Sequence, residues 1–131
     1  MTNQDVFDLA LAYLAEESEA DCADYEERAP LLLGAFVQEC REMNEFYRFS
    51  HGLESSQMLS GLSLSLEDDF PLEDRFAPAA ALYLAAMLIE MEDETISDRF
   101  FARYADEISR ICQMGMPAVR ESIGDVYGFC D

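Results

Sequence analysis

Apolar residues recur at helical spacing near the start of the chain, where Phe7, Leu11 and Leu14 follow one another at intervals of four and three. This spacing places side chains on one face of an amphipathic helix. Thr2 precedes the stripe and Asp5 stands three residues later, which is the arrangement of a capping box at a helix start. We therefore predict a first helix that begins after Thr2, followed by an acidic connection over residues 16–24.

A second helix is predicted over about residues 25–47. Its apolar face is formed by Leu33, Phe36, Val37, Cys40, Met43 and Tyr47. Pro30 lies near the start of this segment and allows two interpretations. It is either the first-turn proline of the main helix, preceded by a short separate turn, or it lies within one longer helix and kinks it.

The helical pattern stops in residues 50–70, where Ser, Gly and Leu dominate. Leu62, Leu64 and Leu66 alternate with serines, and alternation of this kind is typical of a half-buried strand. A lone strand needs a partner for its backbone groups, and no second strand pattern is present. We favour an ordered loop over a strand that pairs with another copy of the chain.

Two further helices follow. Residues 73–91 are apolar almost all the way round, which predicts a helix at the centre of the fold or under a neighbouring subunit. The last helix is expected to open after Asp93 or Thr95 and to end near Gly115 and Pro117. Its inner face is expected to comprise Phe100, Phe101, Tyr104, Ala105, Ile108, Ile111 and Cys112.

These elements predict an all-α protein, a small bundle of three to four helices with an irregular middle loop and a C-terminal tail. Residues 1–115 form the helical domain in this interpretation, and residues 116–131 form the C-terminal extension. The extension contains turn residues and apolar side chains but no helical period. Tails of this kind order when they dock on another surface.

The charge of the chain narrows the range of partners. Its 131 residues suit one domain, and 28 of them are Asp or Glu against 8 basic residues, for a formal charge of −20. Every basic residue is Arg. Nucleic acids and anionic membranes are bound largely through clustered cations, so neither is expected as a primary partner.

The first fifteen residues contain Asp5 and Asp8 and no basic region, so no secretory signal is predicted. The apolar run over residues 76–89 is too short to span a bilayer. We therefore expect a soluble cytoplasmic protein. Its cysteines are far apart, so free thiols are predicted, with Cys40 and Cys112 packed as small apolar groups and no zinc site.

No catalytic, cofactor-binding or metal-binding residues are expected. The acidic pairs lack the spacing of helical Mg²⁺-dependent nucleotide hydrolases and of EF-hands. His51 is the only histidine and lies in a Ser-rich segment without a nucleophile motif, and no glycine-rich phosphate loop is present. The sequence therefore predicts a protein that is not an enzyme.

The arginines suggest a different role. Arg makes directional contacts with carboxylates and is favoured at interfaces. We hypothesise head-to-tail assembly in which arginines of one copy meet carboxylates of the next, although Asp106 and Arg110 have the spacing of a pair within one helix. The candidate interface residues are Arg75, Arg99, Arg103, Tyr104, Val126 and Tyr127.

Several stretches resemble small proteins of Firmicute prophages that belong to the head–tail connector (neck or adaptor) group of tailed bacteriophages. They are FPLEDRF (70–76), AAALYLAAML (79–88), RFFARY (99–104), DVFDLA (5–10), YEERAP (25–30) and IGDVYG (123–128). The resemblance implies a small helical bundle whose copies form a ring beneath the portal. It also implies tails that contact neighbouring neck or tail proteins, and DNA that passes through the ring.

An acidic surface is compatible with that role, since it repels passing DNA instead of binding it. The resemblance places the protein in the bacterial cytoplasm during assembly and then in the neck of the virion. A second hypothesis is an acidic DNA mimic that occupies the nucleic-acid site of a host enzyme. A gene neighbourhood of portal, capsid and tail genes would favour the connector.

Overall fold

The computed structural model describes residues 1–15, 22–55 and 63–114. Within these ranges it contains α1 (Asn3–Ala15), α2 (Cys22–Ser50), the short 3-10 helix η1 (Asp74–Phe76), α3 (Ala77–Ile89) and α4 (Glu94–Met114). The described residues contain one isolated β-bridge, between Thr2 and Asp69, and no strand. The predicted all-α bundle is confirmed.

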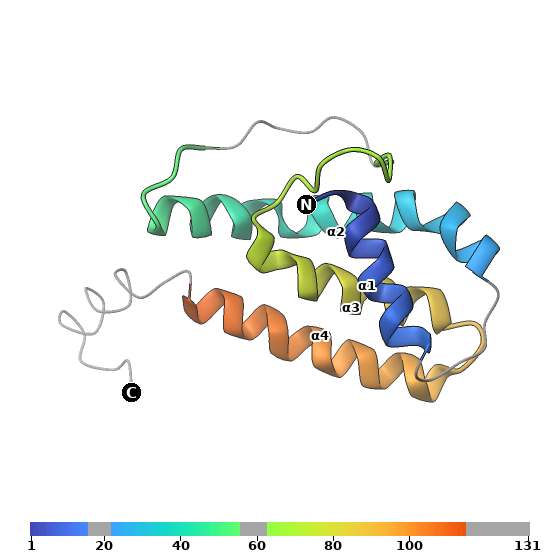
Figure 1. The fold of residues 1–131 in the computed structure, drawn as a ribbon. Helices are drawn as coiled ribbons and strands as arrows, with labels where there is room; N and C mark the ends of the chain where they lie inside the picture. The colour runs from blue at the N-terminus through green and yellow to red at the C-terminus, as the bar shows by residue number, and fades with distance from the viewer. Residues whose placement is uncertain (16–21, 56–62, 115–131) are drawn as a thin grey trace.

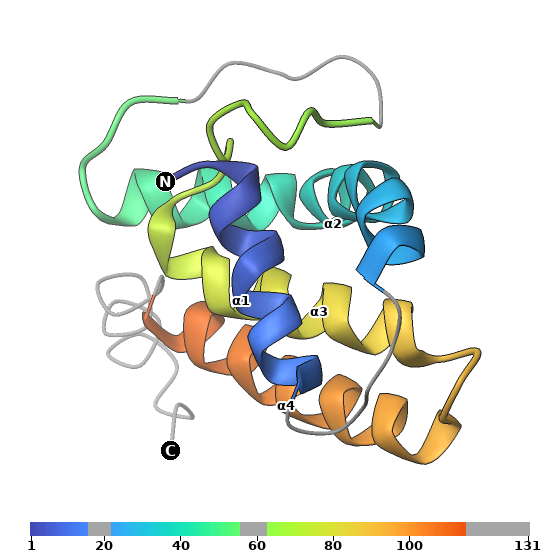
Figure 2. The same cartoon turned by 45° about the vertical axis from the view of Figure 1, so that its right-hand side comes forward.

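The centre of the bundle is α3, which packs against α1, α2 and α4 (Figures 1 and 2). Ten of its residues are buried, among them six alanines, and the small side chains let the neighbouring helices approach closely. Leu84, Leu88 and Ile89 are fully buried. The prediction that the apolar helix lies at the centre of the fold is therefore confirmed, although it is shorter than expected and is preceded by η1.

The long helices alternate in direction. In both views α2 and α4 run the same way, α3 runs opposite to them, and α1 crosses over α3 (Figures 1 and 2). The start of α2, the end of α3 and the start of α4 consequently lie at one end of the bundle. The end of α2 and the end of α4 lie at the other end.

The predicted capping box at the start of α1 is present. The backbone N–H of Thr2 donates to Asp5 Oδ2 at 2.8 Å, and the backbone N–H of Asp5 donates to Thr2 Oγ1 at 3.2 Å. The bond from the Thr2 backbone lowers the pKa of the Asp5 carboxyl. Val6, Phe7 and Leu14 are buried, as the periodicity predicts.

The segment 63–70 lies beside the start of α1 as an ordered loop. Its carbonyl groups accept the otherwise unpaired N–H groups of the helix start: Asn3 N–H donates to Asp68 O, and Gln4 N–H to Leu66 O, both at 2.9 Å. The expected loop is thus confirmed for residues 63–66, while residue 62 lies outside the described residues.

Pro30 lies inside the single long helix α2, which settles the two interpretations in favour of one helix. The helix is longer than predicted, so residues 22–24 belong to it and not to the acidic connection. Its expected apolar face is confirmed, because Leu33, Phe36 and Val37 are fully buried and Cys40 is nearly so.

The start of α4 is capped by Asp93 and not by Thr95. Asp93 Oδ1 accepts the backbone N–H of Ile96 at 3.1 Å, while the Asp93 carbonyl accepts that of Ser97. Ser97 is buried and donates through its hydroxyl to the Ala86 carbonyl at 2.9 Å, which fastens α4 to α3. The inner face of α4 agrees with the prediction except at Ala105, which lies at the edge of this face and is exposed.

Cys40 is buried and Cys112 half-buried, and both are free thiols, as predicted. The expected helix end at Gly115 and the whole C-terminal extension lie outside the described residues. Among the helices of the described ranges, none combines the length and the apolar character that a membrane span requires.

Leu84→Ala tests the central position of α3. We expect it to lower the free energy of unfolding by about 2–5 kcal/mol, since truncation of a buried leucine loses apolar contact and leaves a cavity. Leu31→Ala on exposed α2 surface is the matched control and should cost less than about 0.5 kcal/mol. Urea unfolding measures both, and equal losses would contradict the central position.

Candidate interaction surfaces

The helix α2 ends in a rigid turn built around Gly52. Gly52 has a positive φ of 72°, a backbone conformation that costs glycine little. Its N–H donates to the Phe49 carbonyl at 3.1 Å, and the N–H of Leu53 donates to the Arg48 carbonyl at 2.8 Å. These two bonds form a Schellman motif, which satisfies carbonyl groups at the helix end and fixes the direction of the chain.

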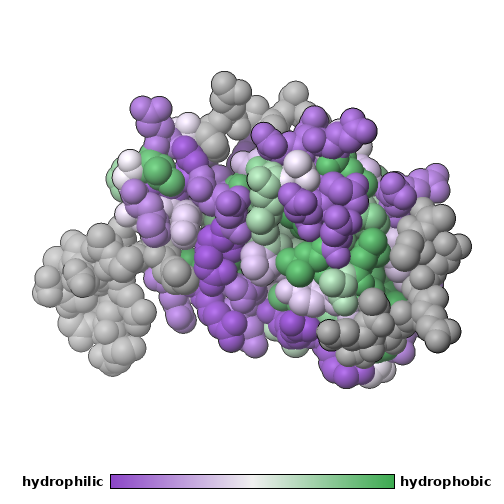
Figure 3. All heavy atoms as spheres, in the orientation of Figure 1, coloured by the Kyte–Doolittle hydropathy of each residue, from purple (hydrophilic) through white to green (hydrophobic). Residues whose placement is uncertain are grey.

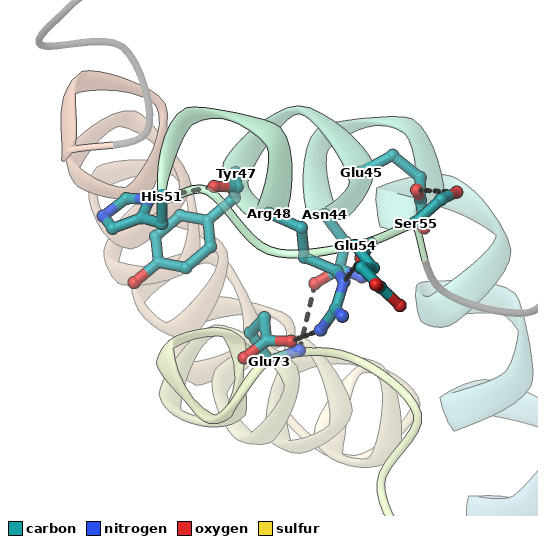
Figure 4. A network of polar contacts seen from close by, with 8 residues as sticks. All are labelled: Asn44, Glu45, Tyr47, Arg48, His51, Glu54, Ser55 and Glu73. Carbon is teal, nitrogen blue, oxygen red and sulfur yellow. Dashed lines mark hydrogen bonds and ion pairs between the residues drawn. The ribbon is translucent and has the colours of Figure 1, made fainter.

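Arg48 holds this turn against the rest of the molecule (Figure 4). Its Nε donates to the Glu54 carbonyl at 2.6 Å, and its Nη1 forms an ion pair with the Glu73 carboxylate just before η1. The backbone N–H of Glu73 donates in turn to Oδ1 of the buried Asn44 at 3.0 Å. One arginine thus joins the end of α2, the turn after it and the start of η1.

Aromatic contacts add a second attachment on the other side of the turn. The rings of Tyr47 and His51 stack with their centroids 4.2 Å apart, and His51 Nδ1 lies 2.8 Å from the Tyr47 carbonyl (Figure 4). Tyr47 also packs edge-on against buried Phe76. The end of α2 is therefore connected to the core through side chains as well as through its backbone.

Three large apolar side chains project from this end into solvent. Phe49 is 76% exposed, Leu53 45% and Phe46 37%, and we call these residues the α2-end patch. In Figure 3 a small green group at the upper left, where Figure 1 draws the end of α2, is surrounded by purple hydrophilic residues. Sequence reasoning missed the patch because it ended the helix at Tyr47, although the spacing of Phe46 and Phe49 was a signal.

A pocket of about 390 Å³ lies at the opposite end of the bundle. We call it the Tyr25 pocket, and it is lined by Asp24, Tyr25, Arg28, Leu88, Met91 and Glu92. The Tyr25 hydroxyl donates to the Glu92 carboxylate and so joins the start of α2 to the turn after α3. Arg28 donates to the Met87 carbonyl at 3.3 Å and pairs with Asp24 at 3.4 Å, so both of its contacts are long.

A cluster of aromatic rings connects α2, α3 and α4 between the two ends. Phe36, Tyr83 and Tyr104 contact one another with ring centroids 5.5–6.1 Å apart. Burial raises the pKa of both tyrosines, and the nearby Glu39 carboxylate acts in the same direction. Burial also raises the pKa of the Cys40 thiol to about 12, so this thiol is protonated at neutral pH.

The structure places several of the predicted interface arginines in contacts within one chain. Arg75 forms an ion pair with Glu107 at 2.9 Å, and Arg110 pairs with the same carboxylate at 3.2 Å. Arg110 thus pairs with Glu107, three positions before it, and not with the expected Asp106. Arg103 lies over the ring of Tyr13 at 5.0 Å, a cation–π contact between α4 and α1.

The other predicted interface residues divide into two groups. Tyr104 is half-buried in the aromatic cluster, and Arg99 is exposed on α4. Val126 and Tyr127 lie outside the described residues. Among the described residues, exposed Arg99 and Arg103 lie one turn apart on α4.

Within the three described ranges, no group of three or more His, Cys, Asp or Glu side chains is placed to hold a metal ion. His51 is exposed and its Nδ1 faces a backbone carbonyl. Comparison with known proteins adds no relative: the chain matches no family model, no curated protein and no solved structure.

The raised pKa values predict that the fold loses stability at alkaline pH. The folded chain holds the protons of Cys40, Tyr83 and Tyr104 more tightly than the unfolded chain, where the thiol ionises near 9 and the phenols near 10. This stabilisation is complete below pH 9 and is lost as the pH rises towards 12. Urea unfolding should show that the free energy of unfolding declines by up to about 1.4 kcal/mol per pH unit for each such group.

The double variant Cys40→Ala/Tyr104→Phe is the control, because it removes two of these protons while the third remains on Tyr83. Its stability should fall less steeply than that of the natural chain between pH 9 and pH 12. A parallel decline in both proteins would mean that the loss comes from other groups.

Proposed function

We propose that this chain is a structural subunit of a tailed bacteriophage, a head–tail connector protein that assembles as a ring at the portal and lets DNA pass. The resemblance of residues 70–76, 79–88 and 99–104 to the connector group names the assembly. The structure supports the more general part of the proposal, a protein that acts through contacts with other proteins.

The observation that carries this part is the α2-end patch. Exposed aromatic side chains that are surrounded by charged residues are typical of protein–protein interfaces. In such interfaces aromatic residues often supply most of the binding energy. Phe49 stands on a turn that is fixed by Gly52 and by the bonds of Arg48. Because the turn is already ordered, a partner that binds it loses little conformational entropy.

The charge of the chain supports the passage of DNA without binding. A formal charge of −20 repels phosphates at close range, and salt of physiological concentration screens this repulsion beyond about 8 Å. Arg75, Arg103 and Arg110 engage groups of the same chain, so these cations do not form a basic surface for nucleic acid. An acidic bundle can therefore lie close to DNA without trapping it.

The test is the addition of the purified chain to phage particles that carry a portal but no neck proteins. Cryo-electron microscopy should show a ring of added density at the portal vertex, and DNA should not compete for binding. Particles without a portal are the control for the site. Phe49→Ser should weaken binding about tenfold or more. Leu31→Ser, which makes the same apolar-to-polar change at another exposed residue of α2, should not weaken it.

Absence of density at the vertex would contradict the connector assignment. Binding to a host nucleic-acid enzyme that added duplex DNA competes away would identify the chain as a DNA mimic instead. The two outcomes are distinguishable, because a mimic is displaced by DNA and a connector is not.

A further inference from the structure

The two surfaces described above lie at opposite ends of the same helix. Tyr25 and Phe49 are separated by 24 residues of α2, about 36 Å at 1.5 Å per residue. One end carries a projecting aromatic side chain, and the other end carries a pocket with an exposed methionine at its edge. A projecting group and a pocket on different faces of one molecule are the elements of a head-to-tail contact between copies.

The Tyr25 pocket has the size that an aromatic side chain requires. Its volume of about 390 Å³ is within the range of pockets that hold small molecules, about 300–1,000 Å³, and therefore accommodates a single phenyl ring. Leu88 and Tyr25 line the pocket but are only 0% and 2% exposed, so the apolar surface that a partner can reach is supplied mainly by Met91. Met91 is 87% exposed at its edge, and the flexible thioether of methionine adapts readily to an aromatic partner.

We propose that Phe49 of one copy inserts into the Tyr25 pocket of the next copy. In this contact Leu53 and Phe46 cover the edge of the pocket beside Met91. The inference rests on the proposed function, because it assigns the contact through which subunits of the ring meet.

One ion pair between copies is compatible with this occupant. Among the described residues that line the pocket, Arg28 is the one cation and stands beside the carboxylates of Asp24 and Glu92. Its two contacts of 3.3 and 3.4 Å are long for hydrogen bonds of a guanidinium. Glu54 follows Leu53 directly, and it is exposed, while its backbone carbonyl is held by Arg48. Insertion of Phe49 brings the Glu54 carboxylate to the end of the neighbouring bundle that carries Arg28.

The directions of α2 and α4 also favour a head-to-tail contact. The ends of α2 and α4 carry partial negative charge, and the starts of these helices carry partial positive charge. Both helices run from the pocket end to the patch end (Figures 1 and 2). Head-to-tail contact therefore brings the ends of α2 and α4 to helix starts of opposite partial charge, whereas α3, which runs the other way, acts in the opposite sense. The contact closes into a ring if the rotation between copies allows.

Photo-crosslinking tests the contact directly. The photoreactive residue p-benzoylphenylalanine replaces Phe49 in one preparation and Leu31 in a control preparation, and each is irradiated as an equal mixture of ¹⁴N- and ¹⁵N-labelled full-length chains. Mass spectrometry should find mixed-isotope products that join position 49 to the peptide containing Leu88 and Met91, and position 31 should not give this product. Products at another site from position 49 would overturn the proposal.

Sedimentation of single variants provides the second test. Phe49→Ser should weaken self-association about tenfold or more, and Leu31→Ser should leave it unchanged, with circular dichroism showing that both remain folded. Arg28→Glu and Glu54→Arg should each weaken it, and the double variant should recover the affinity of the natural chain. Absence of recovery would overturn the ion pair, and equal association of the natural chain and Phe49→Ser would overturn the insertion.

The outcomes also separate this inference from the proposed function. A chain that remains monomeric at 0.5 mM but adds to the portal vertex overturns the contact and leaves the connector assignment intact. A chain that associates through Phe49 but does not bind to portal-bearing particles overturns the connector assignment and leaves the contact intact.

Discussion

The burial of α3 is the constraint on which the rest of the structure depends. A helix that is apolar on every side must be covered on every side, and α1, α2 and α4 provide that cover. The short turn between Ile89 and Glu94 makes α4 run opposite to α3. After a connection of 26 residues between Ser50 and Ala77, α3 also runs opposite to α2. The starts of α2 and α4 thereby reach one end of the bundle, and their ends reach the other. The two candidate contact surfaces are thus consequences of how the core is covered.

The acidic surface limits where such a protein can touch a partner. With a formal charge of −20, copies repel one another unless apolar contacts or ion pairs compensate. Two of the arginines considered for assembly, Arg75 and Arg110, share Glu107 within the chain, while Arg99 and Arg103 are exposed, so arginine-mediated assembly stays a hypothesis. Apolar surface is a further source of favourable contact, and the α2-end patch offers it among charged neighbours such as Arg48 and Glu54.

Local signals predict the fold better than the candidate surfaces. The capping box of Thr2 and Asp5 and the position of α3 follow from spacing and apolar content, which act within a few residues of chain. The loop bonds to Asn3 and the burial of Ser97 depend on residues far apart or on the neighbouring helix, so no local pattern indicates them. The Tyr25 pocket is likewise formed by two segments that meet only because α2 and α3 are antiparallel.

The central claim is that the two ends of the acidic bundle are its contact surfaces. Amide hydrogen exchange, compared between dilute and concentrated solutions of the natural chain, tests it most directly. The account predicts that exchange slows on concentration in residues 47–54 and in residues 24–28 and 88–92 together, while residues 98–106 on α4 do not change. Slowing that is confined to the exposed face of α4, or exchange that does not depend on concentration, would contradict it.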